Sequence, residues 1–87
     1  MGNGENREFE FMTDQTLKNK ALFLLYLIED FAKINQLSVK SAFNYLKRYK
    51  GVDFLDKYYE AEHLLPFEDV IKDVTIICQQ NGGGILL

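Results

Sequence analysis

The chain has 87 residues, of which 47% are hydrophobic and 14% aromatic, and its formal net charge is −3. This length predicts one domain, and the apolar content excludes a disordered chain. The negative charge argues against a protein whose whole surface binds nucleic acid or anionic lipid. One cysteine cannot form an internal disulfide, and one histidine leaves no basis for a zinc site. Because no charged-then-apolar leader opens the sequence, we expect an intracellular, cytoplasmic protein.

Residues 1–12 are predicted to be a flexible lead-in, in which Glu8–Phe11 alternates charged and apolar residues too briefly to assign a strand. Thr13 or Asp14 can cap the helix that follows, from about Gln15 to Asn35. This helix contains the uncharged run Ala21–Ile28, whose residues occupy nearly every face. The pattern predicts a central helix buried from several sides. The alternative is a helix with one face left for a partner or a second copy.

A second helix is predicted from Val39 to Tyr49, with Ser38 as its N-cap and Leu37 packing on Ala42 as a hydrophobic staple. Gly51 is expected to end it in the left-handed conformation. The residues expected on the buried face are Val39, Ala42, Phe43 and Leu46.

Charge is distributed unevenly along the chain. Residues 1–30 hold six acids and three bases, residues 31–52 hold five bases and no acid, and residues 53–87 hold seven acids and two bases. A helix end, a short turn and a basic amphipathic helix are typical of a helix-turn-helix. In that interpretation Lys47, Arg48 and Lys50 contact phosphates, and Lys40, Ser41 and Asn44 face base edges. The alternative is an ordinary solvated face, since any helical hairpin with a polar outer side gives this pattern.

The same basic segment contains aromatic residues, as single-strand binders do. Tyr45 and Tyr49 are the candidates for stacking on bases, because Phe43 lies on the predicted core face. The alternative is that both tyrosines are partly buried and serve the fold.

A third helix is predicted from Phe54 to about Ala61, capped by Asp53. Pro66 can open a fourth, since proline is favoured in the first turn. Its apolar face predicts a helix, although the β-branched content of Val70–Cys78 also suits a strand. Glycines at 82–84 end this element, so that residues 13–82 form the single helical domain and residues 83–87 a C-terminal tail.

Tyr59 and His63 are separated by one helical turn and lie near several carboxylates in the sequence, which is a composition that acid–base catalysis can use. A lone histidine near a helix end is more often structural, and no nucleophile motif lies beside it. Cys78 falls on an apolar face and is expected to be a buried thiol. We therefore predict no catalytic, cofactor-binding or metal-binding residue, no small-molecule substrate and no enzymatic activity.

The sequence resembles a family of small bacterial proteins from gut Firmicutes and Bacteroidetes, which is known only as a domain of unknown function. The matching segments are Ile28-Glu29-Asp30-Phe31, Leu37-Ser38, Ala42-Phe43, Tyr49-Lys50-Gly51, Asp53-Phe54-Leu55, Tyr59 with His63, Asp73-Val74 and Gly82-Gly83. The family usually has leucine before the histidine and a small hydroxyl residue after it, whereas this chain has Glu62 and Leu64. The resemblance implies a small helical domain in which Tyr59, His63 and Asp73 have unknown roles. It also implies a frequent gene neighbour encoding an ADP-ribosyltransferase-like protein, and hence an antitoxin-like role.

These observations predict an all-α fold, a compact bundle of about four helices with a central apolar first helix and a helix-turn-helix-like second helix. We expect a non-enzymatic module that binds another protein, as an antitoxin does, or itself as a homodimer. The alternative function is DNA binding through the Ser38–Lys50 helix. The run Ala21–Ile28 is too short to cross a membrane, which takes ~20 apolar residues.

Overall fold

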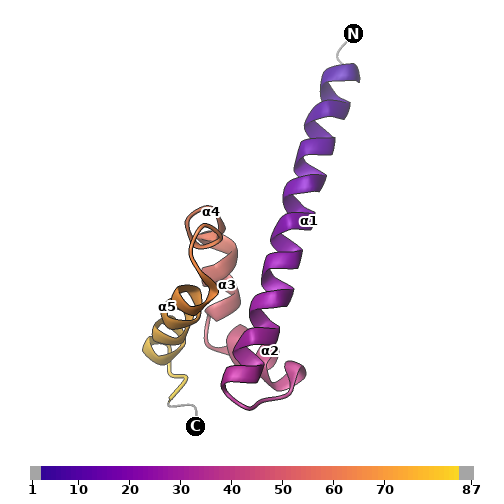
Figure 1. Ribbon diagram of the computed structural model, residues 1–87. Helices are drawn as coiled ribbons and strands as arrows, with labels where there is room; N and C mark the ends of the chain where they lie inside the picture. The colour runs from indigo at the N-terminus through magenta and orange to yellow at the C-terminus, as the bar shows by residue number, and fades with distance from the viewer. Residues whose placement is uncertain (1–2, 85–87) are drawn as a thin grey trace.

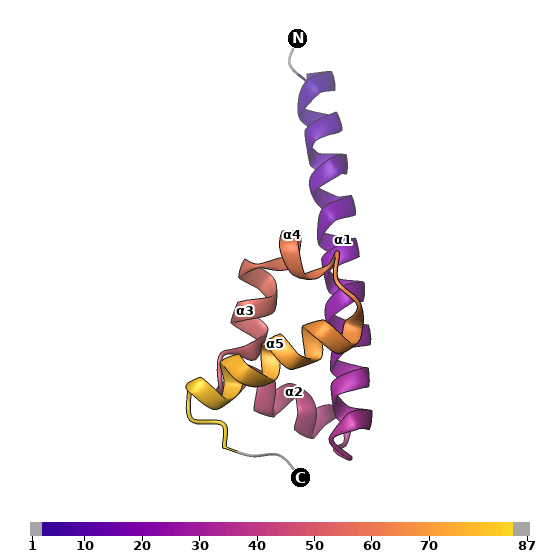
Figure 2. The same cartoon turned by 60° about the vertical axis from the view of Figure 1, so that its left-hand side comes forward.

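The computed structural model describes residues 3–84, and the side chains of residues 15–84, as a chain of helices without a strand. The helices are α1 (Asn3–Ile34), α2 (Val39–Arg48), α3 (Gly51–Lys57), the single turn α4 (Tyr59–Glu62) and α5 (Phe67–Gln80). The predicted all-α class is confirmed. Where the sequence predicts one third helix, a break at Tyr58 separates α3 from α4. The helices α2–α5 gather beside the C-terminal half of α1, whose other half projects beyond them (Figures 1 and 2).

The first helix is longer than the sequence predicts. It begins at Asn3, so the cap expected at Thr13 or Asp14 is wrong, and Glu8–Phe11 lies within the helix. Residues 3–12 are hydrogen-bonded helix in the segment assigned to a flexible lead-in. The limits of the domain at residues 13 and 82, and the tail at 83–87, stay predictions, and residues 85–87 lie outside the described part of the chain.

Only one side of α1 is buried, which corrects the prediction of a helix buried from several sides. Leu27 and Phe31 are fully buried and Phe23 almost so, whereas Leu22, Leu25 and Tyr26 are 46–53% exposed. The physical reason is size, because a chain this short has too few other elements to surround a helix. The four shorter helices all pack on the same side of α1 (Figure 2).

The second helix is close to its prediction in length and in its N-cap. The Ser38 hydroxyl accepts a 3.0 Å hydrogen bond from the Ser41 backbone N–H, which satisfies one of the free amides of the first turn. Ala42 and Leu46 are fully buried as expected. Val39 and Phe43 are exposed, so their predicted burial is wrong: the buried stripe of α2 is narrower than its apolar content indicates.

Gly51 has a packing role and not the predicted role of ending α2. Lys50 takes the left-handed conformation at this bend, with φ of 73°, and Gly51 is already the first residue of α3. A Cβ at Gly51 would lie 2.9 Å from both Cys78 Sγ and Leu46 Cδ2. Glycine therefore permits α5 to lie directly against the α2–α3 corner.

The last helix settles the helix-or-strand question, since Val70–Cys78 lies entirely within α5. Its predicted apolar face is confirmed, with Val70, Val74 and Cys78 fully buried. After the helix, the Gly83 N–H donates to the Cys78 carbonyl O at 2.8 Å. The core joins all five helices and comprises Phe23, Leu27, Ile28, Phe31, Ala32, Ala42, Leu46, Leu55, Tyr59, Val70, Ile71, Val74 and Cys78.

Replacing Gly51 with alanine tests the close approach. The methyl group would overlap Leu46 and Cys78, and overpacking of this kind lowers the free energy of unfolding by roughly 1–3 kcal/mol. Urea denaturation followed by circular dichroism measures it. Asn44→Ala, at an exposed position of α2, is the control and should stay within about 0.5 kcal/mol of the parent. A Gly51→Ala protein as stable as the parent would contradict the packing described here.

Candidate functional site

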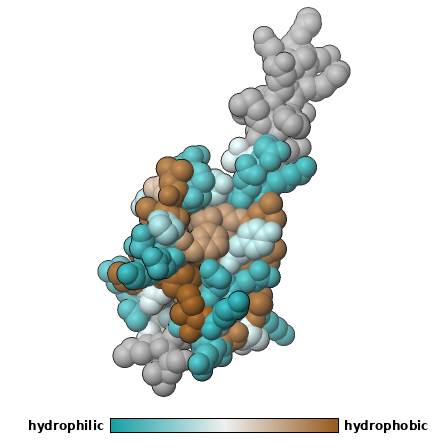
Figure 3. Space-filling model, viewed as in Figure 1, coloured by the Kyte–Doolittle hydropathy of each residue, from teal (hydrophilic) through white to brown (hydrophobic). Residues whose placement is uncertain are grey.

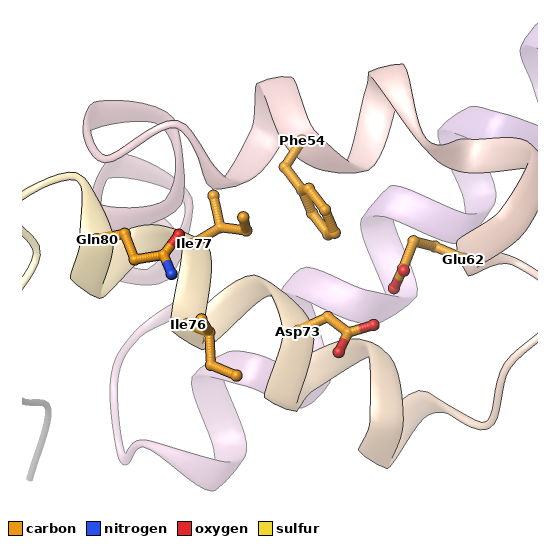
Figure 4. Close-up of a pocket in the computed structure, with 6 residues that line it drawn as sticks. All are labelled: Phe54, Glu62, Asp73, Ile76, Ile77 and Gln80. Carbon is orange, nitrogen blue, oxygen red and sulfur yellow. The ribbon is translucent and has the colours of Figure 1, made fainter.

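A cavity of about 310 Å³, broadly open to solvent, lies between α3, α4 and α5. Its volume is at the lower end of the range typical of small-molecule sites. The side chains that line it are Phe54 from α3, Glu62 from α4, and Asp73, Ile76, Ile77 and Gln80 from α5 (Figure 4).

Helical spacing places the α5 side chains in the cavity. Asp73, Ile76, Ile77 and Gln80 are three or four residues apart, so that they share one side of the helix. Phe54 projects from the facing side of α3, where its ring packs on Tyr58 with centroids 5.3 Å apart. The cavity therefore has apolar walls and an acidic end.

Glu62 is an unusual residue for the interior of so small a protein. Its side chain is only 7% exposed, and its Oε1 is buried without a hydrogen-bond partner. Burial raises the pKa of Glu62 to about 7, and the Asp73 carboxyl adds to the rise through a hydrogen bond and through charge repulsion. Figure 4 shows the two carboxyl groups turned toward the same space. Glu62 therefore changes its protonation state near neutral pH.

The predicted basic face is present on α2. Lys40, Ser41, Asn44, Lys47 and Arg48 are all exposed along this helix, and Lys50 is exposed at the bend that follows. Two of the cations lie over aromatic rings: Lys47 Nζ is 5.9 Å from the Phe43 centroid, and the Arg48 guanidinium is 5.5 Å from that of Tyr49. Lys20–Asp56 is the ion pair found among the side chains of residues 15–84, so the charges of α2 are not neutralised within that part of the chain.

Tyr45 and Tyr49 are half-buried and belong to the fold. The Tyr45 ring stacks on Phe31 with centroids 5.8 Å apart and contacts Tyr49 at 5.0 Å. Burial raises the pKa of the Tyr45 phenol, with smaller contributions from Cys78 and Tyr49. The Tyr45 hydroxyl is buried without a hydrogen-bond partner. Neither ring is free on both sides to stack on a base.

Tyr59 and His63 are neighbours, as their spacing predicts, but they lie outside the cavity. Their rings stack with centroids 4.5 Å apart. The His63 Nδ1–H donates to the Tyr59 carbonyl O at 2.8 Å, which ties the imidazole to its own chain. Tyr59 is buried and packs edge-to-face on Phe23. The structure thus separates Asp73, which lines the cavity, from the other two motif residues.

Metal and thiol chemistry find little support in residues 15–84. No three His, Cys, Asp or Glu side chains in this region converge to hold a metal ion. Cys78 is buried, and burial raises its thiol pKa to about 11, which leaves it protonated at neutral pH. Within the described part of the chain, no helix has the length and apolar character needed to span a bilayer.

Asp73 is among the residues singled out from the sequence, but its partnership with Glu62 is not predicted. A usable signal exists in α5, where Asp73 falls between the apolar residues Val70, Val74 and Ile77 and so interrupts the buried face. Nothing in the sequence signals that Glu62 reaches the same cavity, because this depends on how the α4 turn packs against α5.

Residues 22–81 match the family model described as Protein of unknown function (DUF3791), so the chain belongs to that family. The match begins within α1 and ends just after α5, and it includes every cavity residue. No curated protein and no solved structure matches the chain.

The raised pKa of Glu62 predicts a pH-dependent stability. The folded protein holds the Glu62 proton more tightly than the unfolded chain, whose glutamate pKa is 4.5. The protonated Glu62 therefore stabilises the folded state fully below pH 4.5, and this stabilisation is lost as the pH rises to 7. The free energy of unfolding falls by about 3 kcal/mol at most. Glu62→Gln should remove this loss and be more stable than the parent at pH 8.

Urea denaturation from pH 4.5 to pH 8 measures the effect. The control is Glu60→Gln, an exposed acid on the same turn, which should keep the parent's pH dependence. A Glu62→Gln protein with the same pH dependence as the parent would show that Glu62 does not titrate in this window.

Proposed function

We propose that this protein is a non-enzymatic interaction module that pairs through the exposed face of α1. The observation that carries the proposal is the row Leu22, Leu25 and Tyr26, which is about half exposed along one face of α1. Brown apolar surface borders the globule on the α1 side in Figure 3. Isolated exposed apolar residues are normal, whereas a contiguous row on one helix face is typical of an interaction site.

The order of residues on this face favours a second copy as the partner. In two antiparallel helices, residues whose numbers have a constant sum face each other. With the twofold axis between Phe23 and Leu24, Leu22 faces the second copy's Leu25, and Lys18 faces its Glu29. A face that is complementary to itself in this way is what a symmetric dimer requires.

The charges and the shape of the molecule agree with this pairing. Lys18 and Glu29 are exposed and make no ion pair with side chains in residues 15–84. α3, α4 and α5 lie together on one side of α1 in Figure 1, which leaves the row Leu22, Leu25 and Tyr26 accessible to a second copy. Burying a fully exposed leucine side chain contributes ~1.5–3 kcal/mol. Leu22 and Leu25 are about half exposed in the monomer, so each of the four leucines in a symmetric interface contributes about half of that.

An enzymatic function receives no support from the Tyr59–His63 pair, since His63 bonds a backbone carbonyl and Tyr59 is buried. An antitoxin-like role would use the same α1 face for a different protein. A monomer in solution would favour that role over the homodimer.

The solution mass, measured by sedimentation equilibrium, tests the pairing. We expect a dimer for the parent and a monomer for Leu22→Glu/Leu25→Glu, with an unchanged helical circular-dichroism spectrum because both positions are exposed in the monomer. The control is Leu64→Glu, at the most exposed large apolar residue that the structure describes outside α1, and this variant should remain a dimer.

The antiparallel arrangement is tested by exchanging charges. Lys18→Glu alone should weaken the dimer, and Lys18→Glu/Glu29→Lys should restore it, since each altered residue then meets an opposite charge on the second copy. A double variant that dimerises no better than Lys18→Glu would exclude this register.

DNA binding is the second candidate function, favoured by the exposed basic side of α2. A Lys47→Ala/Arg48→Ala variant should bind duplex DNA less tightly and show a shallower salt dependence, since two phosphate contacts are lost. Fluorescence anisotropy between 50 and 200 mM salt measures both quantities. Lys57→Ala, an exposed lysine on α3, is the control. Equal affinity of the double variant and the parent would exclude this function.

A further inference from the structure

The cavity between α3, α4 and α5 contains a polar atom that the protein leaves without a partner. The Glu62 side chain is more than nine-tenths buried and lines the cavity, and its Oε1 has no hydrogen bond. Burying a carboxyl oxygen without a donor is costly, so such atoms are rare and call for an explanation. A bound donor would supply one.

The acidic end of the cavity has no counter-charge of its own. Glu62 and Asp73 provide two carboxyl groups, while the other lining residues are Phe54, Ile76, Ile77 and Gln80, none of which is cationic. Two carboxyls that share a small space repel when both are ionised. A cation placed between them would relieve the repulsion and donate to the free Oε1.

The rest of the cavity selects the kind of cation. Ca²⁺ and Mg²⁺ prefer six or more oxygen ligands, whereas the side chains of this lining offer two carboxyl groups and the Gln80 amide oxygen. Phe54, Ile76 and Ile77 instead form walls suited to methylene groups, and an aromatic ring also attracts an organic cation. The volume of about 310 Å³ admits a group of side-chain size.

We propose that this cavity binds an alkylammonium or guanidinium group, with the cation between Glu62 and Asp73 and its aliphatic stem along Phe54, Ile76 and Ile77. The group can come from a free small amine or from a lysine or arginine side chain of a peptide. The site does not involve the exposed residues of α1, so this proposal does not depend on the homodimer.

Binding through this site depends on pH. From α3 the cavity receives only Phe54, and from α5 Asp73 brings the other carboxyl group of the lining beside Glu62. Since the Glu62 pKa is about 7, the cation must displace a proton at lower pH. The affinity should be about tenfold higher at pH 8 than at pH 6.

Titration with n-butylammonium chloride, followed by methyl NMR of Ile76 and Ile77, tests the proposal on the full chain. We expect saturable shifts that n-butanol, the neutral analogue, does not produce. Glu62→Gln and Asp73→Asn should each weaken binding about tenfold. Glu68→Gln, an exposed acid in the first turn of α5, is the control and should bind as the parent does.

A capped Gly-Lys-Gly peptide separates the two sources of the cation. Tighter binding of the peptide than of n-butylammonium would identify a protein side chain as the ligand, and equal or weaker binding would identify a free amine. The proposal is overturned if n-butanol shifts the same methyl groups equally, or if the folded Glu62→Gln and Asp73→Asn proteins both bind with the parent's affinity. Repeating the titration with the Leu22→Glu/Leu25→Glu protein separates this result from that of the α1 pairing.

Discussion

The approach of α5 to Gly51 is the constraint on which the rest of the structure depends. Because Gly51 has no side chain, Cys78 and Leu46 fill the space that a Cβ would occupy, and α5 lies directly against the corner between α2 and α3. This contact fixes the position of α5 at its C-terminal end. At the other end, Phe67 packs edge-to-face on Phe23 of α1. Held at two points, α5 presents Asp73 beside Glu62, and the cavity is a direct consequence.

The sequence predicts the features that depend on local spacing and misses those that depend on how much surface is covered. The Ser38 cap and the buried stripe of α5 follow from patterns within a few residues, and both are confirmed. The run Ala21–Ile28 is equally apolar on the side that is buried and on the side that is not. Only the number and arrangement of the other helices decides which side is covered. The predicted basic face follows from spacing on one helix, whereas the Glu62–Asp73 pair joins two elements and has no local signal.

Gly51 illustrates why residue type alone can mislead. A glycine after a basic amphipathic helix is typical of a left-handed helix end. Here Lys50 adopts the left-handed conformation, although it has a side chain. Gly51 lies at the contact with α5. Close packing between distant segments has outweighed the local preference, since only glycine fits the contact whereas a lysine can tolerate the positive φ at modest cost.

The exposed face of α1 and the acidic cavity share one structural support. Phe23 lies on the buried side of α1. Its ring centroid is 5.4 Å from that of Tyr59 and 5.8 Å from that of Phe67. Tyr59 begins the turn that ends at Glu62, and Phe67 begins the helix that contains Asp73. Both carboxyl-bearing elements therefore rest on the same side chain of α1, whose opposite face is free. This aromatic cluster keeps the two carboxyl groups close despite their repulsion. To separate them, either α4 or α5 would have to move and lose its contact with Phe23.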